Sequence, residues 1–245
     1  MAILLLLVAA LIAGFIDTLV GGGGLITIPA LLAAGVPPIA ALGTNKLQAC
    51  AGSGTATLTL VQKGKVSLNV VKWSMLTAFV GSLIGAVAVQ FFDAATLEFL
   101  IPLVMVLILI YFVASPKPSA EDSQAKISQS TYRATAVPVV GFYDGMFGPA
   151  TGSFFVLAGV TLRGQSIINA TVVAKTLNFA TNVASLLVFF WFGEVAIAIG
   201  LLMMIGQFVG ARIGANTLMS INPNALRGLV VLMCVVMLAF WLTGR

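Results

Sequence analysis

The sequence contains no histidine and few charged residues, and these two absences exclude several classes of protein. Only 8% of the 245 residues are Asp, Glu, Lys or Arg, whereas soluble chains average about 25%. A chain without histidine lacks the commonest general base and the commonest metal ligand. Cysteine is also rare, and both Cys50 and Cys234 lie within apolar runs, where a cysteine acts as a small hydrophobic residue. The composition therefore argues against a soluble domain, an enzyme, a metal site, a bound cofactor and a disulfide.

Long apolar runs make up most of the chain. A helix needs about 20 apolar residues to cross a bilayer, and several runs approach or exceed that length: 2–19, 39–62, 67–92, 95–113, 166–192, 195–218 and 225–243. The runs are continuous rather than alternating, which disfavours a transmembrane β-barrel. The basic residues lie mainly in loops, so the net charge of +5 bears on membrane topology and not on nucleic-acid binding. The sequence predicts an all-α polytopic membrane protein surrounded by lipid.

Two stretches about half a chain apart resemble each other, which indicates an internal duplication. Residues 14–46 and 141–175 share glycine, aspartate and lysine positions in one register. The offset is 127 residues at first and 129 after a two-residue insertion. The matched pairs include Gly14 with Gly141, Asp17 with Asp144, Gly21 with Gly148, Lys46 with Lys175, Gly81 with Gly210 and Gly85 with Gly214. We therefore divide the chain into repeat one (1–113), a polar linker (114–133) and repeat two (134–245).

The charged loops predict that the two repeats are inserted in opposite directions. Lys63 and Lys65 follow the run 39–62, whereas the equivalent turn of repeat two carries Glu194. Because cytoplasmic loops are enriched in Lys and Arg, we expect the first turn and the linker in the cytoplasm and both termini outside. Inversion requires an odd number of crossings per repeat. Three long transmembrane helices with a broken or re-entrant helix pair satisfy this, as would five shorter spans, and we favour the pair.

Glycine-rich breaks interrupt the short apolar segments at equivalent places in the two repeats. Each break leaves the N-terminus of a short helix pointing into the protein, and such an end binds anions. The candidate ligand-binding residues at the breaks are Gly22, Gly23, Gly24, Thr151, Gly152 and Ser153. The alternative is that glycine only allows close helix packing, which we favour for the pairs Gly81/Gly85 and Gly210/Gly214.

Lys46 and Lys175 lie within apolar runs, where a charged residue costs about 2.5–3.5 kcal/mol. We predict that both ammonium groups face a central cavity and pair with an anionic substrate or with Asp17 and Asp144. The alternative is that each lysine reaches the nearer membrane interface and only anchors its helix. Nearby polar residues are further candidates for binding the substrate: Thr44, Asn45 and Asn178.

Asp17 and Asp144 come just before the two breaks, which suggests two roles. As carboxylates in a desolvated setting they are suited to bind and release a coupling proton. As acceptors they are equally suited to cap the exposed N–H groups at the breaks. The sequence does not choose between proton coupling and a structural cap.

These motifs resemble the TauE/SafE family of sulfite and organosulfonate exporters, also called toluenesulfonate uptake permeases. In the first half the resemblance rests on Asp17 with Gly21–Gly24 and Pro29, followed by Gly43–Lys46. In the second half it rests on Gly145–Ser153 and Lys175, so that it covers nearly the whole chain. The resemblance implies transport of a small sulfur-containing anion, such as sulfite or a sulfonate, across a bacterial inner membrane. Repeat two has GPATG where repeat one has GGGGL, so the two half-sites need not be equivalent.

Together these features predict a secondary transporter of a small oxyanion, with alternating access around a midplane site. Inverted repeats with broken helices are typical of such carriers. No nucleotide-binding motif is present, so an ion gradient or the gradient of the substrate would drive transport. The sequence leaves two alternatives, an anion channel and a membrane assembly protein that transports nothing. It does not fix the anion, the direction, the coupling ion or the oligomeric state.

Overall fold

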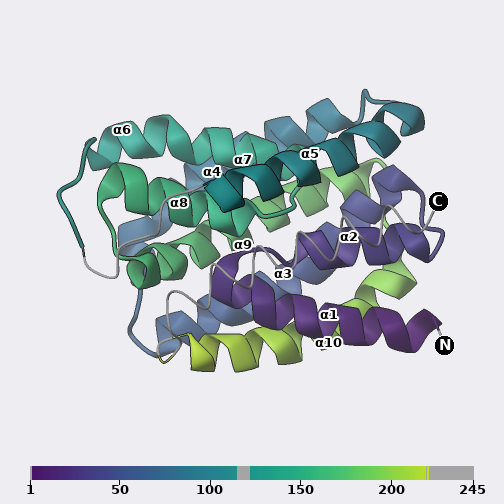
Figure 1. Ribbon diagram of the computed structural model, residues 1–245, viewed down its shortest axis with the longest axis horizontal. Helices are drawn as coiled ribbons and strands as arrows, with labels where there is room; N and C mark the ends of the chain where they lie inside the picture. The colour runs from purple at the N-terminus through teal and green to yellow at the C-terminus, as the bar shows by residue number, and fades with distance from the viewer. Residues whose placement is uncertain (1, 115–121, 219, 221–245) are drawn as a thin grey trace.

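All regular elements in the described part of the chain are helices, as Figure 1 shows for the computed structural model. The structure describes residues 2–114, 122–218 and 220. The helices are α1 (Ala2–Val20), α2 (Gly24–Ala33), α3 (Pro38–Gln62), α4 (Leu68–Val89), α5 (Ala94–Ala114), α6 (Gln129–Ala134), α7 (Ala136–Met146), α8 (Thr151–Arg163), α9 (Ile167–Trp191) and α10 (Ile197–Thr217). The predicted apolar run 225–243 lies outside the described residues.

The lengths of these helices fit a membrane-spanning bundle. Within the described residues, α1, α4, α9 and α10 are long and apolar enough to cross a membrane. The 25 residues of α3 rise about 37 Å at 1.5 Å per residue, more than the hydrocarbon core of about 30 Å. The helices α2 and α8 have 10 and 13 residues and are too short to cross. They follow the two predicted breaks.

The bundle has polar side chains inside and apolar side chains outside. The central helix α9 buries 72% of its span, whereas α1, α4 and α10 bury 39–44% of theirs. The outer faces carry large apolar residues such as Leu5, Ile84 and Ile205, exposed by 63%, 58% and 60%. The buried polar residues lie mainly on α3 and α9. This distribution suits a protein whose surroundings are lipid rather than water.

Helix packing between the repeats depends on glycine. Gly85 on α4 lies against the backbone of Phe142 on α7, where a Cβ atom would come within 2.0 Å of the carbonyl oxygen. Gly210 on α10 lies equally close to the carbonyl oxygen of Leu11 on α1, at 2.0 Å. Each contact joins one repeat to the other. These glycines therefore act as close-packing residues, as expected from their uninterrupted runs.

The equivalent helices α3 and α9 run in opposite directions. The Thr57 hydroxyl on α3 donates to the carbonyl of Lys175 on α9 at 3.1 Å. Further along α9, the Asn182 amide donates to Ser53, which precedes Thr57 on α3, at 3.4 Å. Because the residue numbers of the contacts rise along α9 and fall along α3, the two helices are antiparallel. Inverted repeats require this direction, although the insertion of the repeats in a membrane stays a prediction.

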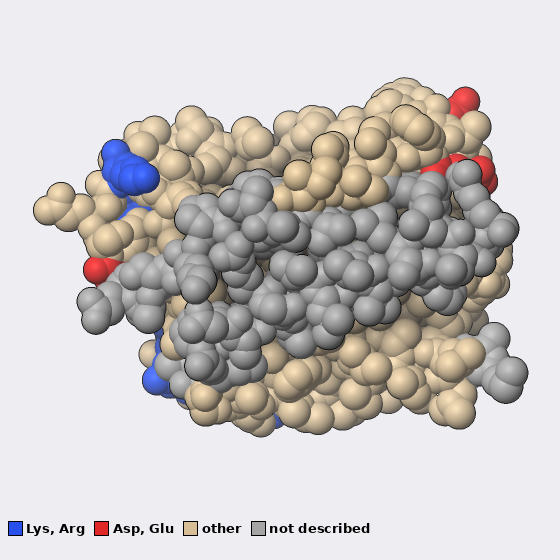
Figure 2. Space-filling view, in the orientation of Figure 1, with Lys and Arg blue, Asp and Glu red and all other residues tan. Residues whose placement is uncertain are grey.

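Apart from Lys46, Lys175, Asp17 and Asp144, which lie inside the bundle, the charged residues lie mainly at its two ends. The connection after α3, with Lys63 and Lys65, lies at the same end as the start of α9, because α3 and α9 are antiparallel. Figure 2 shows Lys and Arg at one end of the visible face and most of the Asp and Glu at the other. This separation is in line with the predicted cytoplasmic and external ends.

The residues between the repeats are packed, and they contain a short helix that we did not predict. Asp122 accepts hydrogen bonds from the backbone N–H of Ser166, at 2.5 Å, and from the Asn169 amide, at 3.2 Å. These bonds lower the pKa of the Asp122 carboxyl below its ordinary value. The backbone N–H of Ser123 donates to the carbonyl of Gly164 just after α8 at 2.6 Å, and that of Lys126 donates to the carbonyl of Leu162 in the last turn of α8 at 3.0 Å. The described part of the predicted linker is therefore fastened to repeat two.

The close approach of α4 and α7 predicts a strong effect of a side chain at Gly85. Gly85→Leu forces the two backbones apart, and overpacking of this kind costs about 1–3 kcal/mol or more. A cost of that size lowers Tm by roughly 3 °C or more in a chain of this length. Thermal unfolding in detergent measures it. The side chain of the neighbouring Ile84 points outward, so the control variant Ile84→Leu should leave Tm unchanged. An equal drop in Tm in both variants would contradict the packing role of Gly85.

The bonds at Asp122 predict that its side chain holds the linker to α9. Asp122→Ala speeds hydrogen exchange at the amides of Ser123 and Lys126, whereas Asp93→Ala at the opposite end does not. Because the folded-state pKa of Asp122 lies below its ordinary 3.8, its contribution is complete above that value and is lost as the pH falls through the lower folded pKa. Unchanged exchange in Asp122→Ala would refute this attachment.

Candidate functional site

The two helix breaks touch each other inside the bundle. Gly21 has φ 83°, a left-handed conformation that suits glycine. A Cβ atom there would lie 2.3 Å from the Cα of Gly152. The hydroxyl of Ser153 donates to the carbonyl of Val20, the last residue of α1. From this contact, α2 and α8 run towards opposite ends of the molecule (Figure 1).

The second break is built from residues that cannot continue a helix. Gly148 has φ 90° and Ala150 has φ 59°, and Pro149 between them has no N–H to donate. The Tyr143 hydroxyl donates to the Pro149 carbonyl at 2.7 Å and holds the turn against α7. The chain can therefore leave α7 at Met146 and start α8 at Thr151.

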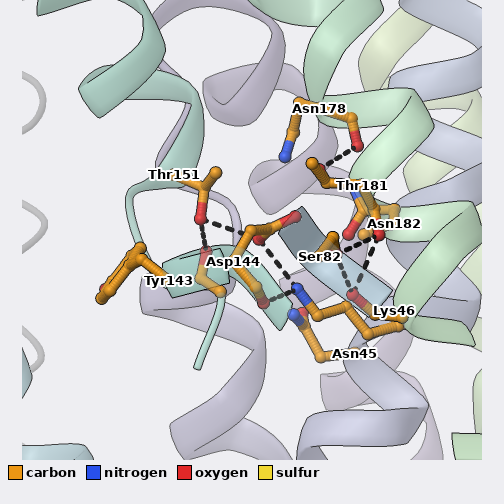
Figure 3. A network of polar contacts seen from close by, with 12 residues as sticks. Asn45, Lys46, Ser82, Tyr143, Asp144, Thr151, Asn178, Thr181 and Asn182 are labelled. Atoms are coloured by element: carbon orange, nitrogen blue, oxygen red, sulfur yellow. Dashed lines mark hydrogen bonds and ion pairs between the residues drawn. The ribbon is translucent and has the colours of Figure 1, made fainter. Parts of the chain in front are cut away.

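Lys46 forms a buried ion pair with Asp144 at the second break (Figure 3). Its Nζ lies 2.8 Å from Oδ1 of Asp144 and 2.5 Å from the carbonyl oxygen of the same residue. The Thr151 hydroxyl donates to the same Oδ1 at 2.7 Å. Both charged side chains are 1% exposed, and Oδ2 of Asp144 has no hydrogen-bond partner. One carboxylate oxygen thus takes both donors while the other takes none.

Lys175 forms the equivalent pair with Asp17 at the first break. Its Nζ lies 3.2 Å from Oδ2 of Asp17 and also donates to the carbonyl of Asp17. Oδ1 of Asp17 accepts from the backbone N–H of Gly23 at 3.1 Å. Both carboxylate oxygens therefore have a donor, and the Asp17 side chain is 16% exposed. Asp17 acts as a cap for the break and as an ion-pair partner at once.

The two pairs cross between the repeats. Each lysine belongs to one repeat and pairs with the aspartate of the other, and neither reaches an interface, since Lys46 and Lys175 are 1% and 0% exposed. Two positive and two negative charges leave this site without net charge. Removing one partner of such a buried pair costs about 3–5 kcal/mol, because the remaining charge loses its compensation.

Both ammonium groups lie beside the second break. A Cβ atom on Gly148 would come within 2.7 Å of Lys46 Nζ, and one on Gly152 within 3.2 Å of Lys175 Nζ. The two glycines thus leave the space that the ammonium groups occupy. Two cations next to the N-terminus of α8 form an arrangement that can hold a small anion once an aspartate gives way.

The other predicted residues divide into two groups. Asn45 lies near the first break, where its Oδ1 accepts from Thr27 at 2.6 Å and from Gln48 at 2.9 Å. The carbonyl of Gly22 accepts from the N–H of Leu25 in the turn before α2, and Gly24 lies against Pro149 of the second break. Asn178 is buried one turn beyond Lys175 on α9, and Figure 3 shows it beside Thr181.

Thr44 belongs elsewhere. Its hydroxyl accepts from the backbone N–H of Ala196 at 2.9 Å, just before α10 begins. Thr44 therefore holds the residue that precedes α10 rather than a residue of the breaks.

The structure also places polar residues inside the bundle that our sequence analysis did not single out. Gln48 and Gln207 are buried, and the Oε1 atom of each has no partner. The Ser82 hydroxyl lies 2.6 Å from that of Ser185, which links α4 to α9. All four residues could have been found in the sequence, because each places an amide or a hydroxyl group within an apolar run.

A family model described as "Sulfite exporter TauE/SafE" matches residues 6–240. The "Probable membrane transporter protein YfcA" of Escherichia coli (strain K12) is 45% identical over 230 residues, which cover 94% of this chain and 86% of the relative. The "Probable membrane transporter protein ORF9" of Sinorhizobium sp is 43% identical over 230 residues, covering 94% and 88%.

A "Probable membrane transporter protein" of Haemophilus influenzae is 41% identical over 228 residues, which cover 93% of this chain and 89% of the relative. No solved structure matches. The matched family and these relatives are membrane transporters and not enzymes. The match over nearly the whole length shows that this chain belongs to the TauE/SafE sulfite exporter family.

Proposed function

We propose that the protein is a secondary transporter of a small sulfur-containing oxyanion, of the sulfite or sulfonate type, with its binding site where the two breaks meet. The observation that carries this proposal is that buried lysines from both repeats converge on the two touching breaks. A charged side chain is costly at membrane depth and is there for a function by default. The family description supports an anion with a sulfur centre.

The chemistry of the site supports an oxyanion. A sulfite or sulfonate group presents three oxygens that accept hydrogen bonds, and an ammonium group offers three donors. Nζ of Lys46 uses two of its donors on Asp144. Thr151 and Ser153 add hydroxyls at the start of α8. The anion would take the place of an aspartate carboxylate at one or both lysines.

The repeated contacts support alternating access. The lysine–aspartate pairs and the glycine contacts each occur twice with the repeats exchanged, so that exchanging the conformations of the repeats gives a second, equivalent arrangement. The two pairs are unequal, because Asp17 is 16% exposed and Asp144 is 1% exposed. This difference in exposure is what we expect of a carrier in a state in which one half of its site is more open than the other.

The distribution of charge supports an inner-membrane orientation with the Lys63/Lys65 end in the cytoplasm. The antiparallel direction of α3 and α9 supports inverted insertion of the repeats. With an odd number of crossings in each repeat, both termini would lie outside.

The crossed pairs predict which variants lose transport without losing the fold. Replacing both members of a pair with uncharged residues, as in Lys46→Met/Asp144→Asn, is close to neutral for stability, whereas Lys46→Met alone destabilises by about 3–5 kcal/mol. The double variant loses the ammonium that pairs with the anion, so counterflow of radiolabelled sulfite falls at least about tenfold. Proteoliposomes loaded with unlabelled sulfite measure this exchange.

The ion pair at the other break is tested in the same way. Lys175→Met/Asp17→Asn is expected to lose counterflow to a similar extent, since both lysines belong to the site. Undiminished counterflow in both double variants would remove the lysines from the mechanism. Sulfite flux without counterflow in the native protein would favour a channel. Absence of both flux and substrate-induced thermal stabilisation would favour an assembly protein.

The inverted insertion predicts opposite labelling of two equivalent loop residues. In a background with Cys50→Ser and Cys234→Ser, a membrane-impermeant maleimide should label Glu194→Cys in intact cells but Lys65→Cys only after permeabilisation. The two positions are related by the repeat offset of 129 residues. The cysteine-free background controls for unspecific labelling. Labelling of both positions from the same side would mean that the repeats are parallel.

A further inference from the structure

The two lysine–aspartate pairs together carry no net charge, and this limits how the site can accept an anion. Lys46 and Lys175 are both compensated by aspartates at 2.8 and 3.2 Å. An added anion would leave one uncompensated negative charge in a buried place, which is strongly unfavourable. An anion that arrives together with a proton adds no net charge. The neutral site therefore favours binding of the two together.

The two aspartates differ in their ability to take that proton. Asp17 has a donor on each oxygen, from Gly23 and from Lys175. Asp144 receives Lys46 and Thr151 on Oδ1 and has a bare, buried Oδ2. A buried anionic oxygen without a donor is more costly than a buried hydroxyl without a partner. Oδ2 of Asp144 is thus the place at the two pairs where a proton relieves an existing cost.

We propose that Asp144 is the proton-binding residue of this carrier, and that a proton on its Oδ2 releases Lys46 to bind the anion. The inference rests on the proposed function and specifies its coupling ion. The proton comes from the aqueous phase on one side and leaves to the other with the anion. Once Asp144 is neutral, the ammonium of Lys46 lacks a counter-charge, and the anion supplies it. Proton and anion therefore bind cooperatively, one for one.

A proton fits this position better than a metal cation does. Hard cations in proteins take six or more oxygen ligands, whereas Oδ2 is a single unpartnered oxygen. Within the described residues, no cluster of three or more His, Cys, Asp or Glu side chains is present. A metal ion at Oδ2 would also place a second positive charge beside the ammonium group of Lys46.

The surroundings of Asp144 contain few other groups that titrate. Lys46 pairs with Asp144, and the thiol of Cys50 lies one turn further along α3. On α7 the neighbouring Tyr143 donates its hydroxyl to the Pro149 carbonyl. The elements packed against α7 contribute Ser82 from α4 and Thr151 from α8, together with Lys175 of α9, which Asp17 holds. Arg133 on α6 and Arg163 on α8 lie in the last turns of their helices, and Lys72 lies in the second turn of α4.

Infrared spectroscopy tests the proton site without any substrate. Acidifying the purified native protein should produce the C=O band of a buried protonated carboxylic acid. The band should be absent in Lys46→Met/Asp144→Asn and retained in Lys175→Met/Asp17→Asn, the matched pair from the other break. Both variants remove one lysine and one aspartate, so a difference between them reports which carboxylate takes the proton. The opposite pattern, or a band that survives in both variants, overturns the assignment.

Transport in proteoliposomes tests the coupling. With the membrane potential clamped at zero, a pH gradient should accumulate labelled sulfite or methanesulfonate about tenfold for each pH unit, as one-to-one coupling requires. Methanesulfonate is included because its neutral acid does not persist in water and cannot cross the lipid unaided. In Asp144→Asn, whatever counterflow remains should no longer be coupled to the pH gradient, so that the labelled anion does not accumulate.

The two proposals fail in distinguishable ways. Counterflow of either probe that ignores the pH gradient leaves the carrier intact and overturns the coupling. Accumulation that persists in Asp144→Asn overturns the role of this residue. No flux of either probe in the native protein overturns the proposed function and the coupling together, while the infrared band still decides whether Asp144 binds a proton.

Discussion

The structure depends on two ion pairs that cross between its halves. A lysine buried among apolar helices is tolerable only if its charge is compensated, and here the compensation comes from the other repeat: Asp144 for Lys46 and Asp17 for Lys175. Either repeat alone would bury a lysine and an aspartate without partners, at a cost of about 3–5 kcal/mol for each broken pair. Each repeat therefore depends on the other for the stability of its buried charges. The glycine contacts between α4 and α7 and between α1 and α10 bring the pairs within reach.

Each pair also closes the two helix ends that a break creates. Where α1 stops, the carbonyl of Asp17 accepts from the backbone N–H of Gly21 at 2.7 Å and also from the ammonium of Lys175. Where α2 starts, an N–H is left over, and the Asp17 carboxylate accepts from Gly23. At the second break Lys46 serves the end of α7, and Thr151 holds Asp144 against the start of α8. The structural cap, which the sequence offered as an alternative to proton coupling, and the ion pair are therefore one arrangement.

Local signals predicted the breaks well, because Gly21–Gly24 and Gly148–Pro149 stop a helix by their own backbone chemistry. The lysines also stood out, since a charge in an apolar run is visible in any sequence. The partner of each lysine was not predictable, because the repeat offset relates Asp17 to Asp144 and is silent on which lysine either one meets. The short helix α6 was missed for a related reason. It depends on the burial of Tyr132 and on a cap by Ser128 rather than on an apolar pattern.

The difference between GGGGL and GPATG explains why the two pairs are chemically unequal. At the first break the backbone N–H of Gly23 reaches Oδ1 of Asp17, which leaves Oδ2 for Lys175. At the second break the equivalent of Gly23 is Ala150, which has φ 59° and follows a proline. The donor there is the hydroxyl of Thr151, and it shares Oδ1 of Asp144 with Lys46. Substitution of a few glycines has thus moved a donor from backbone to side chain. It leaves one carboxylate fully satisfied, as an anchor needs, and the other with a vacant oxygen, as a residue that exchanges protons needs.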